Sequence, residues 1–363
     1  MKCKCITLLI YLFGSCVNPG DDSVVKLERN VPISLFDLFS KVEIIELETI
    51  DESFIKYISQ IVCVDNIYYI LDSKSMSVFI FDGNGRFKHK IANRGNGPEE
   101  YTNVVSFAVD PKSSQIFIVD PLKKELSIYS LSGQFKRKIN LPDIHRASYG
   151  DIYIINRDLI AFASLSKEGR IIYYSLSEQR IVNQYLPEKH SFGFSTQDIT
   201  NNGKYVRSFA KEIYELKESG PELNFVWDFG IENDESKLDF KVNSKEDQMK
   251  FWQMLNQSEI LNYYLVNQLD NAQFNYAKLL YGGHYFNLFY DKQKQNYFLF
   301  DKFKEGVDLY PGYMTDDYML GIATDLSDAE LVLKNQILDK KEQMKLTQIN
   351  VESNPVLVKY HFK

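Results

Sequence analysis

The sequence predicts an all-β protein, a propeller of four-stranded blades, on three observations. First, residues 67–91 align with residues 115–139 at a constant offset of 48 without a gap. Second, the chain contains 25 Phe, 24 Tyr and only 2 Trp, an aromatic usage that favours strands. Third, short apolar runs separated by turns recur along the rest of the chain. A period in the forties made of short strands is typical of propeller blades.

Composition and charge exclude several classes of protein. The chain has 363 residues, 44% hydrophobic and 25% charged, so it is long enough to bury a core and is globular. Its net charge of −7 argues against a nucleic-acid partner, because such proteins normally carry a basic face. Four Cys in a chain of this length exclude a disulfide scaffold.

The first residues predict export. Two lysines precede an apolar stretch at 6–13, and small residues then lead into Cys16. A basic start and a short apolar segment are typical of a signal peptide, and this segment is too short to span a bilayer. Small residues directly before a Cys resemble the bacterial lipobox, which implies that Cys16 is acylated. An ordinary secretory signal with an incidental Cys is the alternative.

The chain is therefore divided into a lipoprotein signal peptide at 1–15, a tether at 16–23 and a single propeller domain at 24–363. The tether carries no strand or helix pattern. Removal of the signal leaves Cys63 as the one cysteine besides Cys16, so no structural disulfide is expected. Cys63 lies in an apolar run, which favours a buried small side chain over a nucleophile.

Each repeat unit contains three recognisable strands. Residues 67–71 are apolar throughout, as in an inner strand buried on both faces. Residues 78–81 form the next strand, and 86–91 alternate apolar and basic residues as a half-exposed outer strand does. Gly85 and Gly133 fall in the hairpin turns, where a positive φ favours glycine.

Fainter copies predict further blades. A third unit covers 170–185, a fourth includes 205–209 and 224–229, and a fifth includes 284–290 and 296–300. The sixth is assembled from the region after residue 316 and the C-terminal run at 356–360. Near-helical spacing of apolar residues predicts a helical insertion at 244–278. Counting residues leaves six or seven blades open.

A resemblance then favours six blades. The segments 79–87, 94–101 and 116–120 resemble NHL-type propeller repeats. The whole chain is more closely similar to the six-bladed β-propeller lipoproteins of anaerobic Gram-negative gut bacteria, through segments 35–49, 317–320 and 354–358. The resemblance implies that an early strand at 42–47 completes the last blade, which removes open sheet edges. It implies almost nothing about activity.

Five residues in predicted strand ends and loops are candidate ligand groups. Asp72 and Asp120 end matching strands, and each either binds a cation or polar ligand at the channel mouth or accepts backbone hydrogen bonds in the next turn. Arg94, Glu99 and Tyr101 belong to the densest polar and aromatic cluster in a predicted loop. That cluster either binds a ligand or anchors one blade to the next.

His284 is the one histidine singled out, because it follows two glycines and precedes a predicted strand; a structural histidine is the alternative. The five histidines are scattered, so spacing supports no zinc site. The chain has no nucleophile elbow, P-loop, EF-hand loop or dinucleotide motif, and no catalytic residue is assigned. No cofactor is assigned either, although a divalent cation in the central channel stays open.

Two functional classes follow. The first is a non-catalytic binding or interaction scaffold, lipid-anchored to the outer membrane and facing the periplasm or the outside, with a glycan, peptide or protein partner. The second is a metal-dependent lyase or hydrolase that uses the central channel, as NHL-like and lactonase propellers do. The absence of a catalytic motif favours binding.

Overall fold

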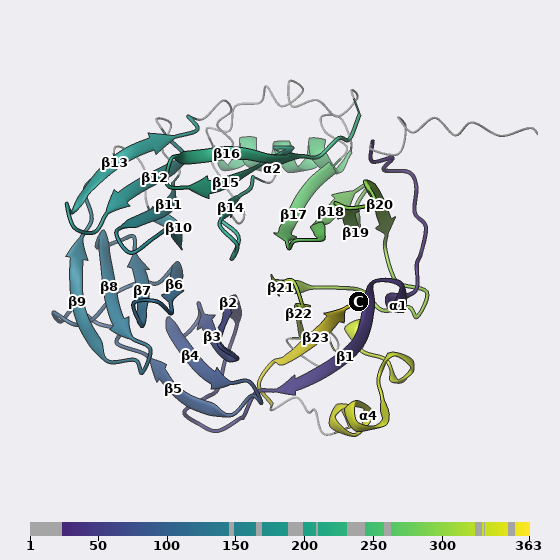
Figure 1. The fold of residues 1–363 in the computed structure, drawn as a ribbon, viewed down its shortest axis with the longest axis horizontal. Helices are drawn as coiled ribbons and strands as arrows, with labels where there is room; N and C mark the ends of the chain where they lie inside the picture. Colours follow the sequence, from purple (N-terminus) through teal and green to yellow (C-terminus); the bar gives the residue numbers. More distant parts are fainter. Residues whose placement is uncertain are drawn as a thin grey trace, which may run out of the picture.

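Six antiparallel sheets surround a central axis, so the protein is a six-bladed β-propeller (Figure 1). The computed structural model describes residues 24–144, 149–164, 169–187, 199–207, 210–230, 244–257, 263–323, 329, 331–347 and 353–363. The predicted fold class is therefore confirmed. The predicted signal peptide (1–15), the predicted tether (16–23) and Cys16 lie outside the described residues.

The first three blades each contain four strands, ordered from the axis outward. Blade 1 is β2 (Ile58–Val64), β3 (Ile67–Asp72), β4 (Ser77–Asp82) and β5 (Phe87–Ile91). Blade 2 is β6 (Ser106–Asp110), β7 (Gln115–Asp120), β8 (Glu125–Ser130) and β9 (Phe135–Asn140). Blade 3 is β10 (Tyr149–Ile154), β11 (Leu159–Ser164), β12 (Ile171–Ser175) and β13 (Arg180–Tyr185).

Blade 4 contains β14 (Lys204–Tyr205), β15 (Glu212–Lys217) and β16 (Gly220–Val226). Ile199 pairs with Tyr205 in a single antiparallel bridge and holds the innermost position of this blade. Blade 5 is β17 (Tyr263–Asp270), β18 (Phe274–Tyr281), β19 (His284–Asp291) and β20 (Asn296–Phe300). Blade 6 is β21 (Pro311–Met314), β22 (Tyr318–Ala323), β23 (Val356–Phe362) and the N-terminal β1 (Phe39–Glu46).

The repeat is confirmed in detail, with one correction. Gly85 and Gly133 have φ of 81° and 77° in the predicted hairpin turns. However, the apolar strand at 67–71 is not innermost, because β2 lies between it and the axis.

The innermost strands also distinguish the two ends of the ring. The loop end is where these strands begin, and the hairpin end is where they turn into the second strands.

The predicted helical insertion is shorter than 244–278. The helix α2 spans Lys245–Asn256, and from Tyr263 onward the chain forms β17 and β18. The later segment is rich in Tyr, Leu and Val, residues that fit a pleated surface as well as a helix. Pairing of β17 with β18 along their full length decides in favour of strands. Among the described residues, no helix is both long enough and apolar enough to cross a membrane.

In the part of the chain that the structure describes, the buried apolar side chains form six clusters, one between each pair of adjacent blades. Between blades 6 and 1, for example, Leu357 and Tyr313 pack with Tyr68 and Phe79. Each middle strand therefore buries side chains on both faces, which explains its unbroken apolar sequence.

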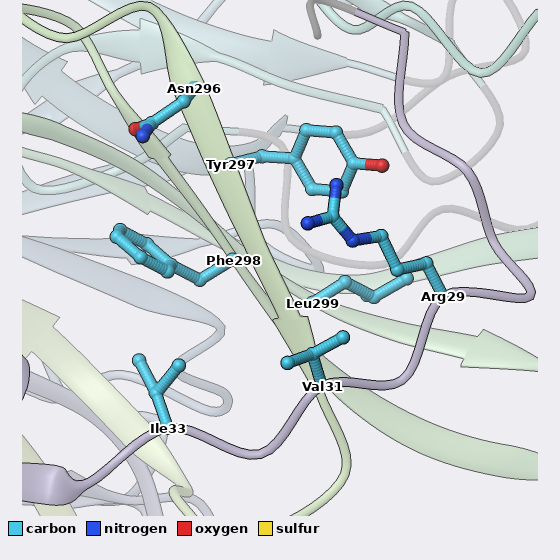
Figure 2. A pocket seen from close by; sticks show the side chains of 7 residues that line it. All are labelled: Arg29, Val31, Ile33, Asn296, Tyr297, Phe298 and Leu299. Carbon is cyan, nitrogen blue, oxygen red and sulfur yellow. The ribbon is translucent and has the colours of Figure 1, made fainter.

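An N-terminal strap crosses the outside of blade 5 before the chain enters β1. Figure 2 shows Arg29, Val31 and Ile33 beside β20, around a small pocket of about 260 Å³. The N–H of Val31 donates to the carbonyl of Leu299 (3.0 Å), and the Arg29 guanidinium lies 6.0 Å from the centre of the Tyr297 ring. The strap thus covers the outer edge of β20, which would otherwise be an open strand edge.

The ring is closed by β1, which pairs antiparallel with β23 from Phe39↔Phe362 to Glu46↔Val356. This confirms the expectation that residues 42–47 complete the last blade. Helix α4 (Lys340–Leu346) lies against the other edge of β1. Within α4, the fully buried Glu342 accepts the N–H of Ile44 (2.7 Å), and Lys345 Nζ donates to the Ile44 carbonyl (2.6 Å). Glu342 and Lys345 therefore bond backbone groups of β1 that would pair with a further strand if one were present.

Replacing Glu342→Ala should lower the free energy of unfolding by about 1–3 kcal/mol, because it leaves the buried Ile44 N–H without an acceptor. Lys340→Ala, an exposed position on the same helix, is the matched control and should change stability by less than about 0.5 kcal/mol. Urea unfolding measures both. Equal effects of the two substitutions would contradict the role given to α4.

Candidate functional site: the axial cavity

A cavity of about 700 Å³ lies on the axis of the ring. Its lining comes from every blade, through the innermost strands and the segments that enter them. Tyr57, Val105 and Pro311 contribute from the loop end, whereas Thr200 and Asn201 contribute from the hairpin end. The cavity falls within the range of about 300–1,000 Å³ that is usual for small-molecule sites.

The described wall of this cavity is largely uncharged. About half of the lining residues are apolar, and the polar ones carry hydroxyls, amides and the single carboxylate of Asp151. No Lys, Arg or His belongs to the described lining. A ligand in this cavity therefore meets dipoles, aromatic rings and one acid rather than a set of charges.

Side chains from adjacent blades bond the inner edges of the innermost strands. Those edges face the axis and have no neighbouring strand, so their polar groups need other partners. In the described part of the ring, such a bond joins five of the six pairs of adjacent blades. The bonds join Gln60 Nε2 to Phe107 O (3.0 Å), Ile199 N to Asp151 Oδ2 (3.3 Å), Asn202 Nδ2 to Asp270 O (2.6 Å), Asn267 Nδ2 to Pro311 O (2.6 Å) and Tyr313 Oη to Cys63 O (2.8 Å).

One side chain reaches across the axis. Asn201 Nδ2 donates to the carbonyl of Met314 in blade 6 (3.0 Å), two blades away. Figure 1 shows the start of blade 4 extending toward the centre of the ring, in agreement with this contact. Asn201 therefore links blades 4 and 6 at the hairpin end of the cavity.

A buried charged cluster lies at the hairpin end, beside the cavity. Asp270 is 7% exposed, and its Oδ2 is 3.9 Å from Lys292 Nζ. Burial raises its pKa above the usual 3.8, although Lys292 and Lys204 oppose the shift and Asn202 donates a hydrogen bond. Glu215, which Lys204 pairs with at 3.0 Å, adds to the raised pKa.

The partner that Asp270 faces across the sheet is also unsatisfied. Asp270 pairs directly with Asn275, which is 1% exposed. Among the described residues, neither amide atom of Asn275 nor Oδ1 of Asp270 has a hydrogen-bond partner. The amide of Asn275 can serve either protonation state of Asp270, so it is the burial of the carboxyl that favours the neutral acid.

The candidate residues Asp72 and Asp120 lie at the loop end, one strand away from the axis. Both side chains are fully buried. Asp120 accepts hydrogen bonds from Thr102 N (2.6 Å) and Asn103 N on the linker, and from Leu122 N and Lys123 N in the next turn. Burial opposes ionisation of Asp120, but these hydrogen bonds outweigh it and lower the pKa.

Asp72 makes the equivalent set of bonds in blade 1. It accepts from Lys56 N (3.0 Å) on the linker and from Lys74 N (2.8 Å) and Ser75 in the turn. These contacts are the backbone hydrogen bonds expected as the alternative to ligand binding. Each carboxylate ties the linker that enters its blade to the turn after the second strand.

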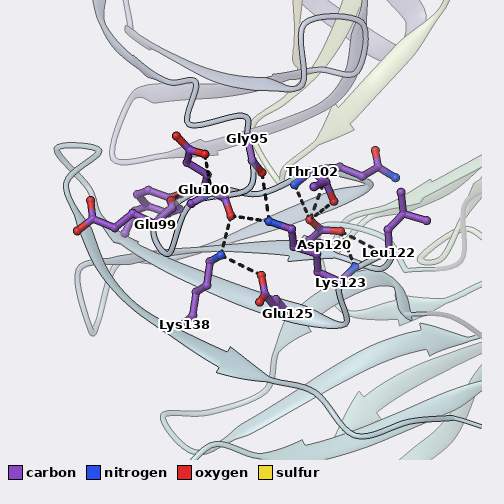
Figure 3. A network of polar contacts seen from close by, with 12 residues as sticks. Gly95, Glu99, Glu100, Thr102, Asp120, Leu122, Lys123, Glu125 and Lys138 are labelled. Carbon is purple, nitrogen blue, oxygen red and sulfur yellow. Dashed lines mark hydrogen bonds and ion pairs between the residues drawn. The ribbon is translucent and has the colours of Figure 1, made fainter.

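The candidate loop 94–101 is anchored to blade 2 (Figure 3). Lys123 and Lys138 both donate to the backbone carbonyl of Glu100, at 3.3 and 2.6 Å, and Lys138 also pairs with Glu125 at 2.9 Å. Glu100 Oε2 accepts the N–H of Gly97 (2.6 Å). These contacts anchor the loop to blade 2, which was the expected alternative to ligand binding.

The other candidate residues lie on the 94–101 loop and at one turn of blade 5. Tyr101 is fully buried, and its hydroxyl donates to the carbonyls of Met76 (2.8 Å) and Ile91 (3.1 Å). Arg94 and Glu99 are exposed on the same loop, outside the cavity lining. His284 is exposed at the β18–β19 turn, two strands from the axis. Arg94 thus pairs with Tyr101 in a single bridge within this loop, whereas His284 lies in blade 5, and none of the four belongs to the described cavity lining.

Cys63 lies on β2 and is a half-buried free thiol. Burial raises the pKa of this thiol, against a hydrogen bond with Tyr318 and the charge of Lys359. In the part of the chain that the structure describes, no group of three His, Cys, Asp or Glu is placed to hold a metal ion.

The residues that line the cavity, among them Gln60, Asp151 and Asn267, were not predicted from the sequence. They lie on innermost strands, which the repeat alignment does not reach because it begins at residue 67. The offset of 48 does relate β2 to β6, but Gln60 then falls on Ala108, so the polar position is not repeated. Only the closed ring brings them together.

The raised pKa of Asp270 predicts how stability depends on pH. The pKa of Asp270 is higher in the folded state than in the unfolded state. Asp270 therefore stabilises the folded state fully below pH 3.8, and this contribution is lost as the pH rises through the folded-state pKa. Asp270→Asn keeps a neutral side chain, so its stability relative to the native protein should be higher at pH 7 than at pH 3.5. Urea unfolding at the two pH values measures this; a difference that is the same at both would contradict it.

Comparisons with known proteins support the fold and place the chain in a family. A protein from Bacteroides fragilis described as exported has a crystal structure with a TM-score of 0.73 and 18% identity, covering 92% of this chain and 98% of that one. A DUF4221 family member from Bacteroides vulgatus has a TM-score of 0.58 and 11% identity, with coverage of 90% and 97%. The search of curated proteins found no match. The family model for the domain of unknown function DUF4934 matches residues 22–361, so the chain belongs to that family.

Proposed function

We propose that the protein is a non-catalytic binding scaffold of the cell envelope, held at the outer membrane through acylated Cys16, with the axial cavity as its ligand site. The observation that carries this proposal is a cavity of about 700 Å³ built from all six blades. Its position is set by the closed ring, so the wall is rigid and largely preformed. Preformed concave sites with a few polar groups are typical of ligand-binding sites.

The chemistry of the wall favours binding over catalysis. A metal-dependent lyase or hydrolase needs three His, Asp or Glu side chains that converge on the axis. The described lining supplies one such side chain, Asp151. Asp72 and Asp120 lie one strand further out and are held by backbone donors.

The envelope location is supported by two observations. The sequence before the described residues carries the basic start, apolar segment and small residues of an export signal, followed by Cys16. The similar structure from Bacteroides fragilis belongs to a protein described as exported.

Replacing Cys16→Ala should release the protein from the membrane fraction, because the acyl chain is the proposed anchor. Cys63→Ala is the matched control and should leave membrane association unchanged, since Cys63 lies within β2. Carbonate extraction of envelopes and mass spectrometry of the mature N-terminus provide the measurements. An unmodified Cys16, or a Cys16→Ala protein that stays in the membrane fraction, would contradict the anchor.

Ligand binding is tested by narrowing the mouth of the cavity. Val105 is 41% exposed and lines the cavity, so Val105→Trp adds bulk at the loop end at low cost to folding. Leu122 is 73% exposed and outside the described lining, so Leu122→Trp is the matched control. Neutral and charged oligosaccharides and peptides are added to the full-length protein in detergent, and the thermal midpoint is recorded.

At least one compound is expected to raise the midpoint in a concentration-dependent way, as binding to the folded state requires. Val105→Trp should remove the shift, and Leu122→Trp should keep it. Saturable turnover of a substrate, or shifts that Val105→Trp leaves intact, would overturn the proposal. Metal analysis of protein prepared without chelator adds a second readout, since a stoichiometric ion favours the enzyme.

A further inference from the structure

The two ends of the ring expose different side chains. At the hairpin end, the structure describes all six turns between first and second strands, and they consist mainly of Asp, Asn, Ser and other polar residues. None of the large apolar side chains that are exposed elsewhere belongs to these turns. The loop end, in contrast, carries apolar side chains that are 41–73% exposed. We define the loop-end face by six of them: Phe54, Tyr57, Val105, Leu122, Tyr285 and Tyr310.

The loop-end face surrounds the axis. Tyr57, Val105 and Tyr310 lie in the segments that enter β2, β6 and β21. Leu122 lies in the turn after β7, and Tyr285 follows the turn after β18, so these two belong to blades 2 and 5. Those blades lie on opposite sides of the axis (Figure 1). Exposed apolar side chains mark protein or membrane contacts, and side chains spread over one whole end of a ring fit a broad, flat partner better than a peptide in a groove.

The N-terminal segment reaches the ring at the same end. The N–H of Val25 donates to the carbonyl of Asp228 (2.7 Å), in the segment that follows β16. Glu28 forms a side-chain hydrogen bond with Tyr281, the last residue of β18, beside the turn that precedes Tyr285. Val25 and Leu27 are buried, which fixes this position. The part of the chain that carries Cys16 therefore joins the ring at its loop end.

The distance from this point to the proposed anchor is short. Val24 is the eighth residue after Cys16. Even a fully extended chain covers only about 3.3–3.6 Å per residue, so Cys16 lies at most about 30 Å from Val24. An acyl chain on Cys16 thus keeps the loop end close to the bilayer.

The side chains of the loop-end face suit the surface of a bilayer. Four of the six are aromatic, and three of these are tyrosines. Tyrosine has an apolar ring and a polar hydroxyl, and it is enriched at the level of the lipid headgroups. Stable attachment through an acyl chain commonly needs a second contact with the bilayer, and exposed apolar side chains provide one.

We infer that the loop-end face rests on the bilayer to which the protein is anchored. This inference rests on the anchor in the proposed function and adds the orientation of the ring. The position of the N-terminal segment, the short distance to Cys16 and the spread of apolar side chains over one end all lead to the same partner. Tyr57 and Val105 also line the cavity, so the loop end of the cavity then lies at the membrane surface.

Quenching by brominated lipids tests this orientation. The acylated protein is reconstituted in phosphatidylcholine vesicles with and without bromine on the acyl chains, which quenches tryptophan at short range only. Leu122→Trp and Tyr285→Trp place a tryptophan on the loop-end face, in blades 2 and 5. Ala272→Trp, at the exposed β17–β18 turn of the hairpin end, and Leu223→Trp, exposed on the outer strand β16, are the controls.

The emission added by Leu122→Trp and by Tyr285→Trp should be lost to a similar extent in brominated vesicles, because both side chains enter the interface. The emission added by Ala272→Trp and Leu223→Trp should be kept. The two native tryptophans are present in all four variants and provide a common background.

Equal quenching at the two ends, or no quenching of Leu122→Trp and Tyr285→Trp, would overturn the inference. Quenching of Leu223→Trp with only one of the two loop-end variants would show that the ring lies on its side, and would overturn it as well. If Leu122→Ser converts an oligomer into a monomer in light scattering and the loop-end variants are not quenched, a second copy covers the face instead.

Mass spectrometry of Cys16 in the same preparation separates this inference from the proposed function. An acylated Cys16 without quenching at the loop end leaves the anchored scaffold in place, and only the orientation is wrong. An unmodified Cys16 refutes the anchor and the orientation that rests on it. Ligand binding in the cavity is then judged by Val105→Trp alone.

Discussion

The pairing of β1 with β23 is the interaction on which the rest of the structure depends. It joins residues more than three hundred positions apart and converts a row of sheets into a closed ring, so no blade is left with a missing neighbour. Each of the six apolar clusters lies between two adjacent blades. A ring that opened between two blades would therefore expose the apolar faces of both. The strap on β20 and helix α4 on β1 protect the outer edges next to this closure.

The same constraint creates the cavity. Six innermost strands that face a common axis cannot pair with one another, and their inner edges would carry unsatisfied backbone groups. Side chains such as Gln60, Asn267 and Tyr313 supply partners across successive blades. Polar side chains are therefore retained at the axis because they satisfy the backbone of the innermost strands.

The sequence was sufficient for the architecture because propellers repeat local patterns. The offset of 48 and the glycines at 85 and 133 depend on neighbouring residues, whereas six blades and the closing strand at 42–47 were expected from the family resemblance. The extent of the helix at 244–278 was wrong because apolar spacing alone does not separate a helix from a buried strand, and β18 decides the matter. The cavity was missed because its residues come from six distant segments that only closure unites.

Hydrogen exchange measured by mass spectrometry tests the role of closure most directly. If β1 is an integral strand of blade 6, peptides covering 39–46 and 356–362 should exchange together and as slowly as the middle strands of blades 1 and 2, because their amides open only with the whole ring. Fast exchange of 39–46 while 67–72 and 115–120 stay protected would show that the ring persists without its N-terminal strand, and would contradict the account.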